Sequence, residues 1–351
     1  MARGRPVREQ ARTYHGNMTD DFAELTVSLR AMGLLAGGEA CAIRALPGGV
    51  SCDVFLVEAE GRLFCVKRAL AKLRVEADWR APTERSHAEI AWMRLVAGID
   101  PAWVPQILGE DRPRHLFAMQ YFPPADFPLW KTQLAEGNAD AGFAAQVGEA
   151  LARIHSATVG RADIVREFAN GAQFQALRIE PYLLYAAARN LDVAAPLQAL
   201  AQNLAGARIA LMHGDVSPKN ILRGPSGPVF LDAETSCYGD PAFDLAFCLN
   251  HLLLKGVWHR EHAAAYAASF AALTSAYFAK ADWEARPALE ARAAALLGAL
   301  MLARIDGKSP VEYLTAERDK QFVRTMAKEF LNGAASLDAM LKRWNEALAQ
   351  K

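Results

Sequence analysis

The chain lacks an excess of charge of either sign. Its 351 residues carry 39 basic and 39 acidic side chains, which gives a formal net charge of +0 when histidine is neutral. Proteins that bind nucleic acid or anionic membranes through general electrostatic attraction need a large basic surplus. The balance therefore argues against nucleic acid as a partner, although it leaves room for a local basic pocket.

Long hydrophobic runs and paired cysteines are also lacking. A membrane-spanning helix needs about 20 consecutive apolar residues, and the apolar stretch Leu252–Leu254 is interrupted by Lys255. The five cysteines include no CxxC pair, so nothing indicates a disulfide framework. The first 20 residues carry four arginines with no apolar core behind them, unlike a secretion signal. We expect a cytoplasmic protein without a membrane partner.

The hydrophobic pattern changes along the chain. Strand-like alternation is expected at 41–46, 53–59, 63–69, 104–108 and 115–121. Helical spacing is expected at 21–35, 83–97, 143–154, 172–189, 195–205, 241–254, 261–280, 283–304 and 316–348. Phe122-Pro123-Pro124 interrupts the sheet pattern because proline lacks the backbone donor. We predict a disordered tail over 1–20, a small sheet-rich lobe over 21–122 and a larger helical lobe over 123–351.

The segment 213–220, with the sequence HGDVSPKN, carries the most informative motif. Phosphoryl transfer needs a carboxylate at the acceptor hydroxyl and an oxygen ligand for magnesium nearby, both on one rigid loop. Asp215 and Asn220 provide this pair. A strand-like run at 229–231 then ends at Asp232, a second hard oxygen ligand. The spacing predicts magnesium-dependent phosphoryl transfer.

HGDVSPKN, followed by LDAE at 231–234 and GDPAFDLA at 239–246, resembles the catalytic core of aminoglycoside phosphotransferases and their choline- and methylthioribose-kinase relatives. The resemblance spans residues 40–250 in the right order. It implies an α+β, bilobal protein-kinase-like fold with a small antiparallel-sheet N-lobe and a mostly helical C-lobe. It also implies that Asp215 is the catalytic base and that Asn220 and Asp232 bind magnesium. His213 would organise the loop, and Asp244 would hold its shape.

The same resemblance implies a nucleotide-binding N-lobe, with the catalytic loop and the acceptor site in the C-lobe. Lys67, in a Cys-Val-Lys context on the third strand-like run, would contact the nucleotide α- and β-phosphates. Glu89 on the following helix would hold this lysine by an ion pair. Glu84 on that helix is an alternative partner for Lys67.

Two backbone segments complete the expected nucleotide site. Residues 47–51, PGGVS, resemble the phosphate-covering turn, to which Gly48 and Gly49 would contribute backbone N–H groups and Ser51 its hydroxyl. Residues 119–122, which include Gln120 and Phe122, fall where the interlobe hinge of the family binds the purine through backbone groups.

Two further features bear on catalysis and on the acceptor. Lys219, four residues after Asp215, is predicted to neutralise charge on the transferring phosphoryl group. Residues 304–310, RIDGKSP, interrupt the C-terminal helices where relatives bind the acceptor. Arg304, Asp306 and Lys308 are therefore candidates to line an acceptor pocket. The alternative is a helix-ending loop with ordinary salt bridges.

The predicted function is transfer of the γ-phosphate of ATP or GTP, with Mg²⁺, to a hydroxyl group of a small molecule. The alternative is a catalytically silent, pseudokinase-type module that only binds nucleotide. Such modules have usually lost the lysine, the base or the metal aspartate, whereas Lys67, Asp215 and Asp232 are all present. The chain ends without an acidic tail, which counts against a polycationic aminoglycoside as the acceptor.

Overall fold

The computed structural model describes residues 18–47, 51–74, 81–333 and 336–351. The chain divides into two compact units, Met1–Ser86 with Ile107–Tyr121, and His87–Gln106 with Phe122–Lys351. The division after Tyr121 lies beside the expected boundary, but residues 87–106, which we assigned to the first lobe, group with the second unit. Helix α1 begins at Met18, so residues 18–20 are helical and not part of a tail. The rest of the predicted tail lies outside the described residues.

The first unit contains an antiparallel sheet in the order β1-β2-β3-β5-β4. Its strands are β1 (Ala42–Leu46), β2 (Cys52–Ala59), β3 (Arg62–Ala69), β4 (Ile107–Asp111) and β5 (Leu116–Gln120). A short 3₁₀ turn, η2 (Arg112–Arg114), connects β4 to β5. The β2–β3 hairpin has a two-residue loop in which Glu60 and Gly61 both have positive φ, 47° and 75°. This geometry matches the right-handed twist of the strands.

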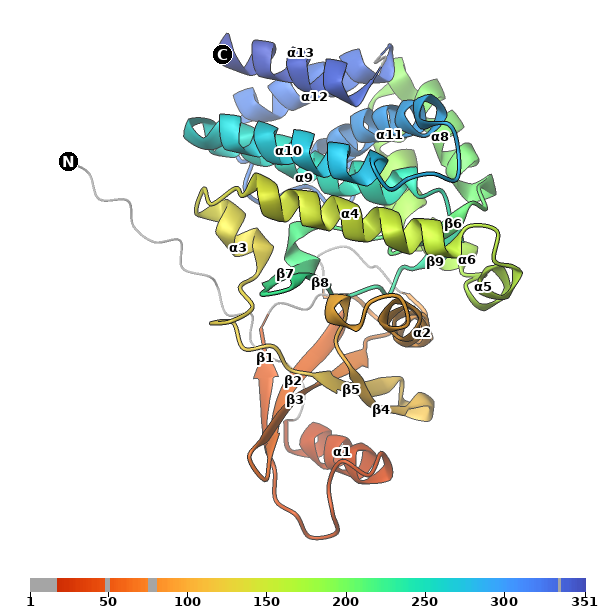
Figure 1. Ribbon diagram of the computed structural model, residues 1–351, viewed down its shortest axis with the longest axis vertical. Coiled ribbons are helices and arrows are strands. Elements are labelled where there is room, and N and C mark those ends of the chain that lie inside the picture. Colours follow the sequence, from red (N-terminus) through yellow and green to blue (C-terminus); the bar gives the residue numbers. More distant parts are fainter. Residues whose placement is uncertain (1–17, 48–50, 75–80, 334–335) are drawn as a thin grey trace, which may run out of the picture. The chain divides into compact units, whose positions relative to one another are not determined.

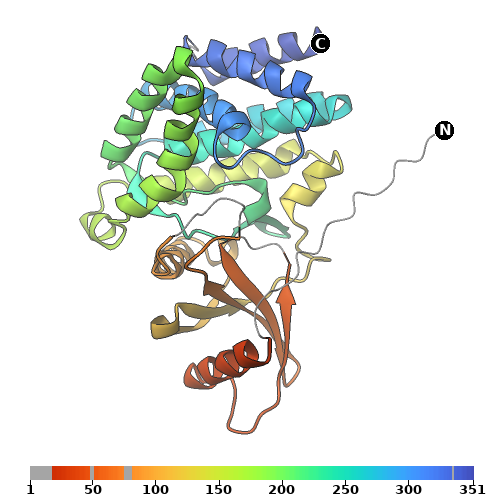
Figure 2. The ribbon, with the colours of Figure 1, turned by 180° about the vertical axis from the view of Figure 1, so that it is seen from behind.

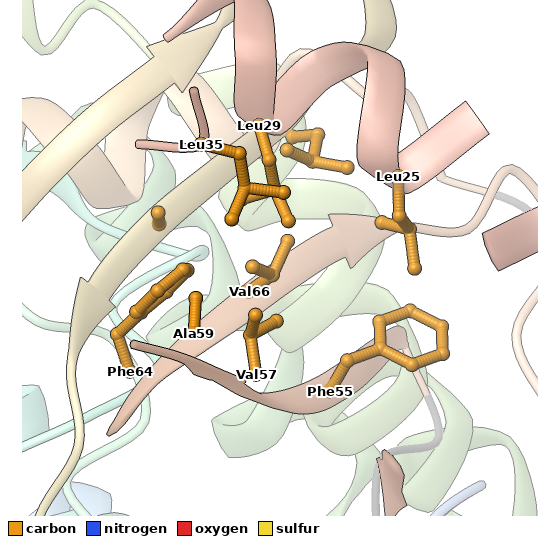
Figure 3. Close-up of a cluster of buried hydrophobic side chains, with 10 residues drawn as sticks. Leu25, Leu29, Leu35, Phe55, Val57, Ala59, Phe64 and Val66 are labelled. Carbon is orange, nitrogen blue, oxygen red and sulfur yellow. The ribbon is translucent and has the colours of Figure 1, made fainter. Parts of the chain in front are cut away.

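One face of this sheet packs against helix α1 (Met18–Ala31). Leu25 and Leu29 of the helix meet the side chains of β2 and β3 in a closed apolar cluster, shown in Figure 3. The strand residues in the cluster are Phe55, Val57, Ala59, Phe64, Val66, Leu116 and Ala118. Because side chains alternate along a strand, Lys67 lies on the opposite face from Val66, where it is also buried.

The second unit is mostly helical (Figure 1). Its helices are α2 (Arg85–Ala97, whose first two residues group with the first unit), α3 (Trp130–Ala135), α4 (Ala141–Thr158), α5 (Ala162–Glu167), α6 (Gly171–Phe174), α7 (Tyr185–Arg189), α8 (Ala194–Gly206), α9 (Ala242–Trp258), α10 (Ala263–Phe278), α11 (Arg286–Asp306), α12 (Glu317–Leu331) and α13 (Leu337–Ala349), with the π-helix η3 (Gln175–Leu184) and the 3₁₀ turns η1 (Pro101–Trp103), η4 (Leu191–Val193), η5 (Pro218–Asn220) and η6 (Arg260–His262). Helices α4 and α10 run side by side (Figure 1, Figure 2). Helix α9 is apolar on nearly all sides and forms the centre of the core, with residues 242–257 buried.

Four short strands in the second unit frame the motif loops. Strand β6 (Ala210–Met212) pairs with β9 (Cys237–Gly239), and β7 (Ile221–Gly224) pairs with β8 (Gly227–Phe230). Residues 213–220 therefore run from β6 to β7, and residues 231–236 run from β8 to β9. In both antiparallel pairs, the strand end that adjoins residues 213–220 lies beside the strand end that adjoins residues 231–236. The two loops therefore lie next to each other.

Some elements differ from the prediction. The single helix expected over 316–348 is two helices, because Ser336 caps α13 by accepting a hydrogen bond from the Ala339 N–H at 3.2 Å. The helix expected over 172–189 contains the π-helix η3, with Pro181 inside it. The fourth strand lies at 107–111 and not at 104–108. The predicted α+β class, a small antiparallel sheet followed by a mostly helical region, is confirmed.

The sequence indicated neither a membrane-spanning helix nor a disulfide framework. Among the described residues, no helix is both long and apolar enough to span a bilayer. All five cysteines lie within the described ranges and are free thiols.

Candidate active site

The loop that begins at His213 is anchored by a buried carboxylate at the start of α9. Asp244 accepts the backbone N–H of His213 at 2.7 Å through Oδ2 and that of Gly214 at 2.9 Å through Oδ1. Asp244 is itself held by His155, whose Nε2 lies 3.3 Å from Oδ2 and whose Nδ1 lies 2.9 Å from the Tyr277 hydroxyl. The first turn of α9 therefore determines where the loop starts.

Glycine is required at position 214 for two reasons. Its φ is +78°, in the left-handed region that side chains disfavour. A Cβ placed there would also approach the Thr235 carbonyl oxygen to 2.6 Å. The close contact allows the loop that carries Asp215 to lie directly against the loop after Asp232.

His213 connects the two loops with both ring nitrogens. Its Nδ1 accepts the backbone N–H of Asp215 at 3.2 Å, and its Nε2 donates to the Leu231 carbonyl at 3.0 Å. Burial lowers the pKa of His213 in spite of the nearby carboxylate of Asp244, which agrees with a neutral ring that donates on one side and accepts on the other. Both nitrogens are occupied, so the ring holds the loops together and is not available for proton transfer.

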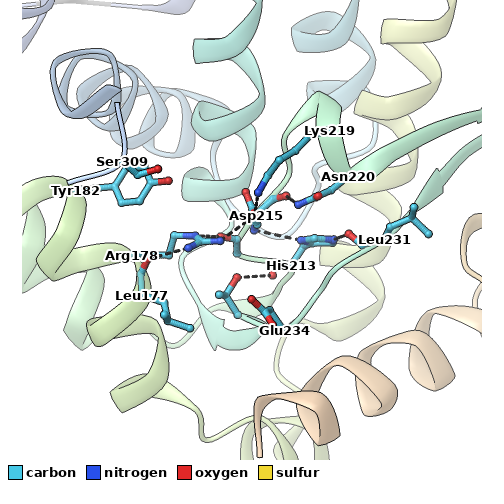
Figure 4. A network of polar contacts seen from close by, with 12 residues as sticks. Leu177, Arg178, Tyr182, His213, Asp215, Lys219, Asn220, Leu231, Glu234 and Ser309 are labelled. Carbon is cyan, nitrogen blue, oxygen red and sulfur yellow. Dashed lines mark hydrogen bonds and ion pairs between the residues drawn. The ribbon is translucent and has the colours of Figure 1, made fainter. Parts of the chain in front are cut away.

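The carboxylate of Asp215 is buried, and two cations bind the same oxygen of it (Figure 4). Arg178 Nη2 lies 3.0 Å and Lys219 Nζ 3.2 Å from Asp215 Oδ2. Burial alone would raise the pKa of Asp215, but the charges of Lys219 and Arg178 hold it below the ordinary value. Asp215 is therefore ionised.

Arg178 is a member of the site that the sequence analysis missed. It projects from the π-helix η3, is 7% exposed, and donates from Nε to the Gly214 carbonyl at 2.6 Å. Its guanidinium carbon also lies 5.8 Å from the ring centres of Tyr182 and Phe247. The only signal in the sequence was an arginine and a proline within a segment of helical periodicity, which does not indicate a contact with the distant motif. π-Helical segments are rare and frequently occur at functional sites.

Asn220 and Asp232 supply oxygen atoms suited to a magnesium ion. Asn220 donates from Nδ2 to the Asp215 carbonyl at 3.0 Å, which leaves its amide oxygen without a hydrogen bond in the described part of the chain. The Leu231 N–H binds the Asn220 carbonyl at 2.8 Å, so the residue next to Asp232 is tied to Asn220. Asp232 has φ of +67°, a conformation that non-glycine residues adopt mainly where the surroundings impose it.

This donor set fits magnesium better than a metal that needs a complete protein cage. No group of three or more His, Cys, Asp or Glu side chains suited to a metal occurs within the described ranges. Magnesium is commonly held by one or two protein oxygens together with phosphate oxygens and water. An amide oxygen and a carboxylate on adjoining loops meet that requirement.

The residues predicted to bind nucleotide in the first unit lie on or beside its sheet. Lys67 is 5% exposed and pairs in register with Val54 and Phe117. Ser51 is buried next to the start of β2, and its carbonyl accepts the Leu70 N–H at 3.0 Å. Gln120 is the last residue of β5. Gly48 and Gly49 lie outside the described residues.

Two predicted nucleotide-site residues belong to the second unit. Glu89 is buried in α2, and its pairing with Lys67 stays a prediction. Phe122 opens the long second segment of the unit, and its ring centre lies 4.6 Å from that of Phe127.

In the segment 304–310, Asp306 makes a structural ion pair, whereas Arg304 and Lys308 contact the helix that carries Arg178. Asp306 binds the Arg324 guanidinium at 2.9–3.1 Å, as the alternative of an ordinary salt bridge predicts. Arg304 is buried and donates to the Ser309 hydroxyl at 3.1 Å. The backbone N–H of Lys308 binds the Pro181 carbonyl at 2.8 Å. The segment is thereby docked on η3, the helix that carries Arg178.

Comparison with known proteins places this arrangement in context. The model of the phosphotransferase enzyme family (APH) matches residues 42–285. Methylthioribose kinase 1 of Oryza sativa subsp. japonica is 25% identical over 277 residues, which cover 69% of this chain and 64% of that protein. The chain thus spans 64% of the length of this curated relative.

Solved structures show the same fold at low identity. A choline/ethanolamine kinase family protein from Mesorhizobium loti superposes with a TM-score of 0.53 at 19% identity, covering 95% of this chain and all of that chain (100%). The ethanolamine kinase of Plasmodium vivax gives a TM-score of 0.51 at 10% identity, covering 97% of this chain and 90% of that one. The expected protein-kinase-like fold of small-molecule kinases is therefore confirmed.

Proposed function

Because the chain belongs to the phosphotransferase enzyme family, we propose that it transfers the γ-phosphoryl group of ATP or GTP to a hydroxyl group of a small molecule. The observation that carries the proposal is the pair of adjoining loops that bears Asp215, Asn220 and Asp232. Their backbones are tied together through His213 and anchored by Asp244. Rigid positioning of this kind is the main contribution of a protein to phosphoryl transfer.

Asp215 orients the acceptor hydroxyl and takes its proton. The hydroxyl oxygen forms a bond to the γ-phosphorus while the bond from that phosphorus to the bridging oxygen breaks, and the nucleoside diphosphate leaves. A carboxylate with a lowered pKa is a weak base, but in a loose transition state the hydroxyl keeps its proton until late. Asp215 therefore acts first as a hydrogen-bond acceptor that aims the oxygen.

Lys219 has two positions available to it in this proposal. Its side chain is half exposed, and its ammonium lies 3.2 Å from Asp215. When it turns to the transferring phosphoryl group, it neutralises charge there and no longer lowers the pKa of Asp215. The carboxylate then becomes a better base at the moment when the proton must leave.

Asn220 and Asp232 would hold the magnesium ion by their oxygen atoms. When bound, the ion supplies neutralisation of the charge on the nucleotide phosphates. The hydrogen bond from Asn220 Nδ2 to the Asp215 carbonyl keeps the amide oxygen of Asn220 directed away from that contact.

The first unit would bind the nucleotide, and the second would carry catalysis and the acceptor. Lys67 would contact the α- and β-phosphates with support from Glu89. Residues 47–51, with Gly48, Gly49 and Ser51, would cover the phosphates, and the backbone near Gln120 and Phe122 would bind the purine. The burial of Lys67 supports a specific role, since a buried lysine is rarely retained without a partner.

A nucleotide-consumption assay with Mg²⁺, run with ATP and with GTP over a panel of hydroxylated acceptors, tests the proposal. We expect Asp215→Asn to lower turnover about 10²–10⁴-fold while nucleotide binding is kept. Asp163→Asn is the matched control, because that carboxylate is exposed on α5 and pairs with Arg161 at the surface. Nucleotide binding without turnover for any acceptor would instead favour the silent nucleotide-binding module.

A further inference from the structure

Arg304 carries a buried positive charge that makes no direct ion pair with a carboxylate in the described part of the chain, although Glu312 lies near enough for the two charges to attract. It is 9% exposed, and its hydrogen bonds go to neutral groups, the carbonyl and hydroxyl of Ser309 and the Tyr182 hydroxyl at 3.4 Å. Its Nε is buried without a hydrogen-bond partner in the described part of the chain. A buried guanidinium normally has a carboxylate partner, because desolvation of an unpaired charge is costly. The arginine is therefore ready to receive an anion.

The guanidinium groups of Arg304 and Arg178 both lie close to the ring of Tyr182. The guanidinium carbon of Arg304 lies 5.9 Å and that of Arg178 5.8 Å from the Tyr182 ring centre. Figure 4 shows Tyr182 and Ser309 on the side of the network where Arg178 reaches Asp215. The Lys308–Pro181 backbone hydrogen bond docks the segment of Arg304 on the helix of Arg178. Two arginines thus lie near Tyr182, and one of them, Arg178, also binds Asp215.

The neighbours of Arg304 include neutral polar groups. Burial lowers the pKa of His251 well below its ordinary value, and the charges of Arg304 and Lys255 act in the same direction. His251 is therefore neutral. Its Nε2 and the Tyr313 hydroxyl are both buried without a hydrogen-bond partner among the described residues. Neutral donors beside an unpaired arginine are the groups that bind the oxygens of an anion.

The acidic side chains near Arg178 and Arg304 are already engaged. Asp306 binds Arg324, and Glu312, on which the charge of Arg304 also acts, binds Lys131 at 2.8 Å. Asp215 binds Arg178 and Lys219, while Asp232 and Glu234 lie close enough to act on Arg178. Asp232 is assigned to the metal above. A cationic acceptor group near Arg304 would therefore meet repulsion from its positive charge.

We propose that the acceptor is a hydroxylated compound that carries an oxyanion, a carboxylate or a phosphate, and that Arg304 binds this group while Asp215 orients the hydroxyl. The inference deepens the proposed function and rests on it for the hydroxyl. The planar fork of a guanidinium matches both oxyanions, and it binds them through parallel hydrogen bonds. Arg178, held to Asp215, links the anion to the catalytic carboxylate and so sets the distance between the charged end and the reacting end of the acceptor.

The first test measures anion binding without any need for turnover. Thermal unfolding is followed in sodium malonate, in inorganic phosphate and in sodium chloride at matched ionic strength. We expect malonate or phosphate to raise Tm of the wild type above the value in chloride, and we expect that rise to be smaller in Arg304→Gln. Arg343→Gln is the control, since Arg343 on α13 is half exposed and pairs with Glu329. An equal rise in wild type and Arg304→Gln, or no rise in the wild type, overturns the proposal.

The second test compares related acceptors with and without an anionic group. Glycerol, glycerate and glycerol 3-phosphate form one set, and pantothenol and pantothenate form another, with choline and kanamycin as cations. We expect kcat/KM for an anionic member to exceed that of its neutral counterpart at least about 10-fold. Arg304→Gln should remove this preference through KM, with KM for the nucleotide unchanged. Comparison of the carboxylate acceptors with the phosphate acceptor shows which oxyanion is bound.

The two proposals fail in different ways. A preference for a neutral or cationic acceptor that Arg304→Gln does not alter overturns the anionic acceptor and leaves the kinase assignment intact. Anion-dependent stabilisation that requires Arg304, with no nucleotide consumed, overturns the kinase assignment and leaves the anion site intact.

Discussion

Arg178 Nη2 lies 3.0 Å from Oδ2 of Asp215, and Nε of the same guanidinium donates to the carbonyl of Gly214 at 2.6 Å. One arginine from η3 thus holds both the side chain of the catalytic carboxylate and the peptide that precedes it. Arg178 is a positioning residue in this account, because it acts on the acceptor hydroxyl through Asp215.

Replacing Arg178 by glutamine should shift the pH dependence of the enzyme. Arg178 lowers the pKa of Asp215, so its removal raises that pKa and moves the acid limb of kcat/KM to higher pH. A group whose pKa is lowered on folding adds stability above its unfolded pKa, and that stability is lost as the pH falls through the folded pKa. Arg178→Gln should therefore cost about 1–3 kcal/mol near pH 7, and less in acid. An acid limb that does not move would contradict the assigned role.

Replacing Lys219 by alanine should affect turnover more than nucleotide affinity. In the proposed transfer the ammonium neutralises the phosphoryl group only as it moves, so its loss removes stabilisation of the transition state and not of the ground state. We expect kcat to fall about 10²-fold with little change in the nucleotide Kd measured by calorimetry. Lys280→Ala is the control, because Lys280 is a similarly exposed lysine 3.6 Å from Glu149. Equal losses in kcat and affinity would argue for ordinary nucleotide binding by Lys219.

Asp244→Asn should weaken both the fold and the catalytic loop. The buried carboxylate accepts two backbone N–H groups, whereas an amide offers one acceptor oxygen and would turn a donor toward the second N–H. The free energy of unfolding in urea should fall by about 1–3 kcal/mol, together with kcat. Asp163→Asn at the exposed Arg161 pair should change neither. Full stability in Asp244→Asn would show that the loop has other support.

Lys255 should oppose folding at neutral pH. Burial lowers its pKa from 10.5 to about 8, and the charge of Lys131 contributes. Below pH 8 Lys255 is charged in the folded state, and the free-energy cost of burying this charge is about 3 kcal/mol. Between pH 8 and 10.5 the unfolded chain binds more protons than the folded one, so stability rises with pH. Lys255→Met should therefore be more stable than the wild type at pH 7, and urea unfolding at pH 9.5 should show a smaller difference. A constant difference across this range would be inconsistent with the lowered pKa.

The sequence predicts those parts of the site that depend on neighbours along the chain. Asp215 and Asn220 are five residues apart in one loop, and their hydrogen bond follows from that spacing. Arg178 and Tyr182 reach the site from a helix elsewhere in the sequence, and nothing local to them indicates the contact. Asp306 could not be assigned before its partner Arg324 was known. Long-range ion pairs of this kind depend on helix packing and not on motif spacing.

The fold was predictable to a similar degree. The β2–β3 hairpin follows from Glu60-Gly61, and α9 follows from its continuous apolar sequence. Pro181 lies inside the helical run that was expected over 172–189, and its accommodation in the π-helix η3 depends on tertiary packing. The break before α13 required the cap at Ser336, since the helical periodicity alone continues across it.

The most direct test of the central claim is mass spectrometry of the acceptor after incubation with nucleotide, Mg²⁺ and the anionic hydroxy compounds named above. The account predicts that the wild-type protein adds one phosphoryl group to an acceptor, and that Asp215→Asn, which still binds nucleotide, does not. Phosphorylated acceptor at the wild-type rate with Asp215→Asn would contradict the role given to this carboxylate and to the loop that holds it.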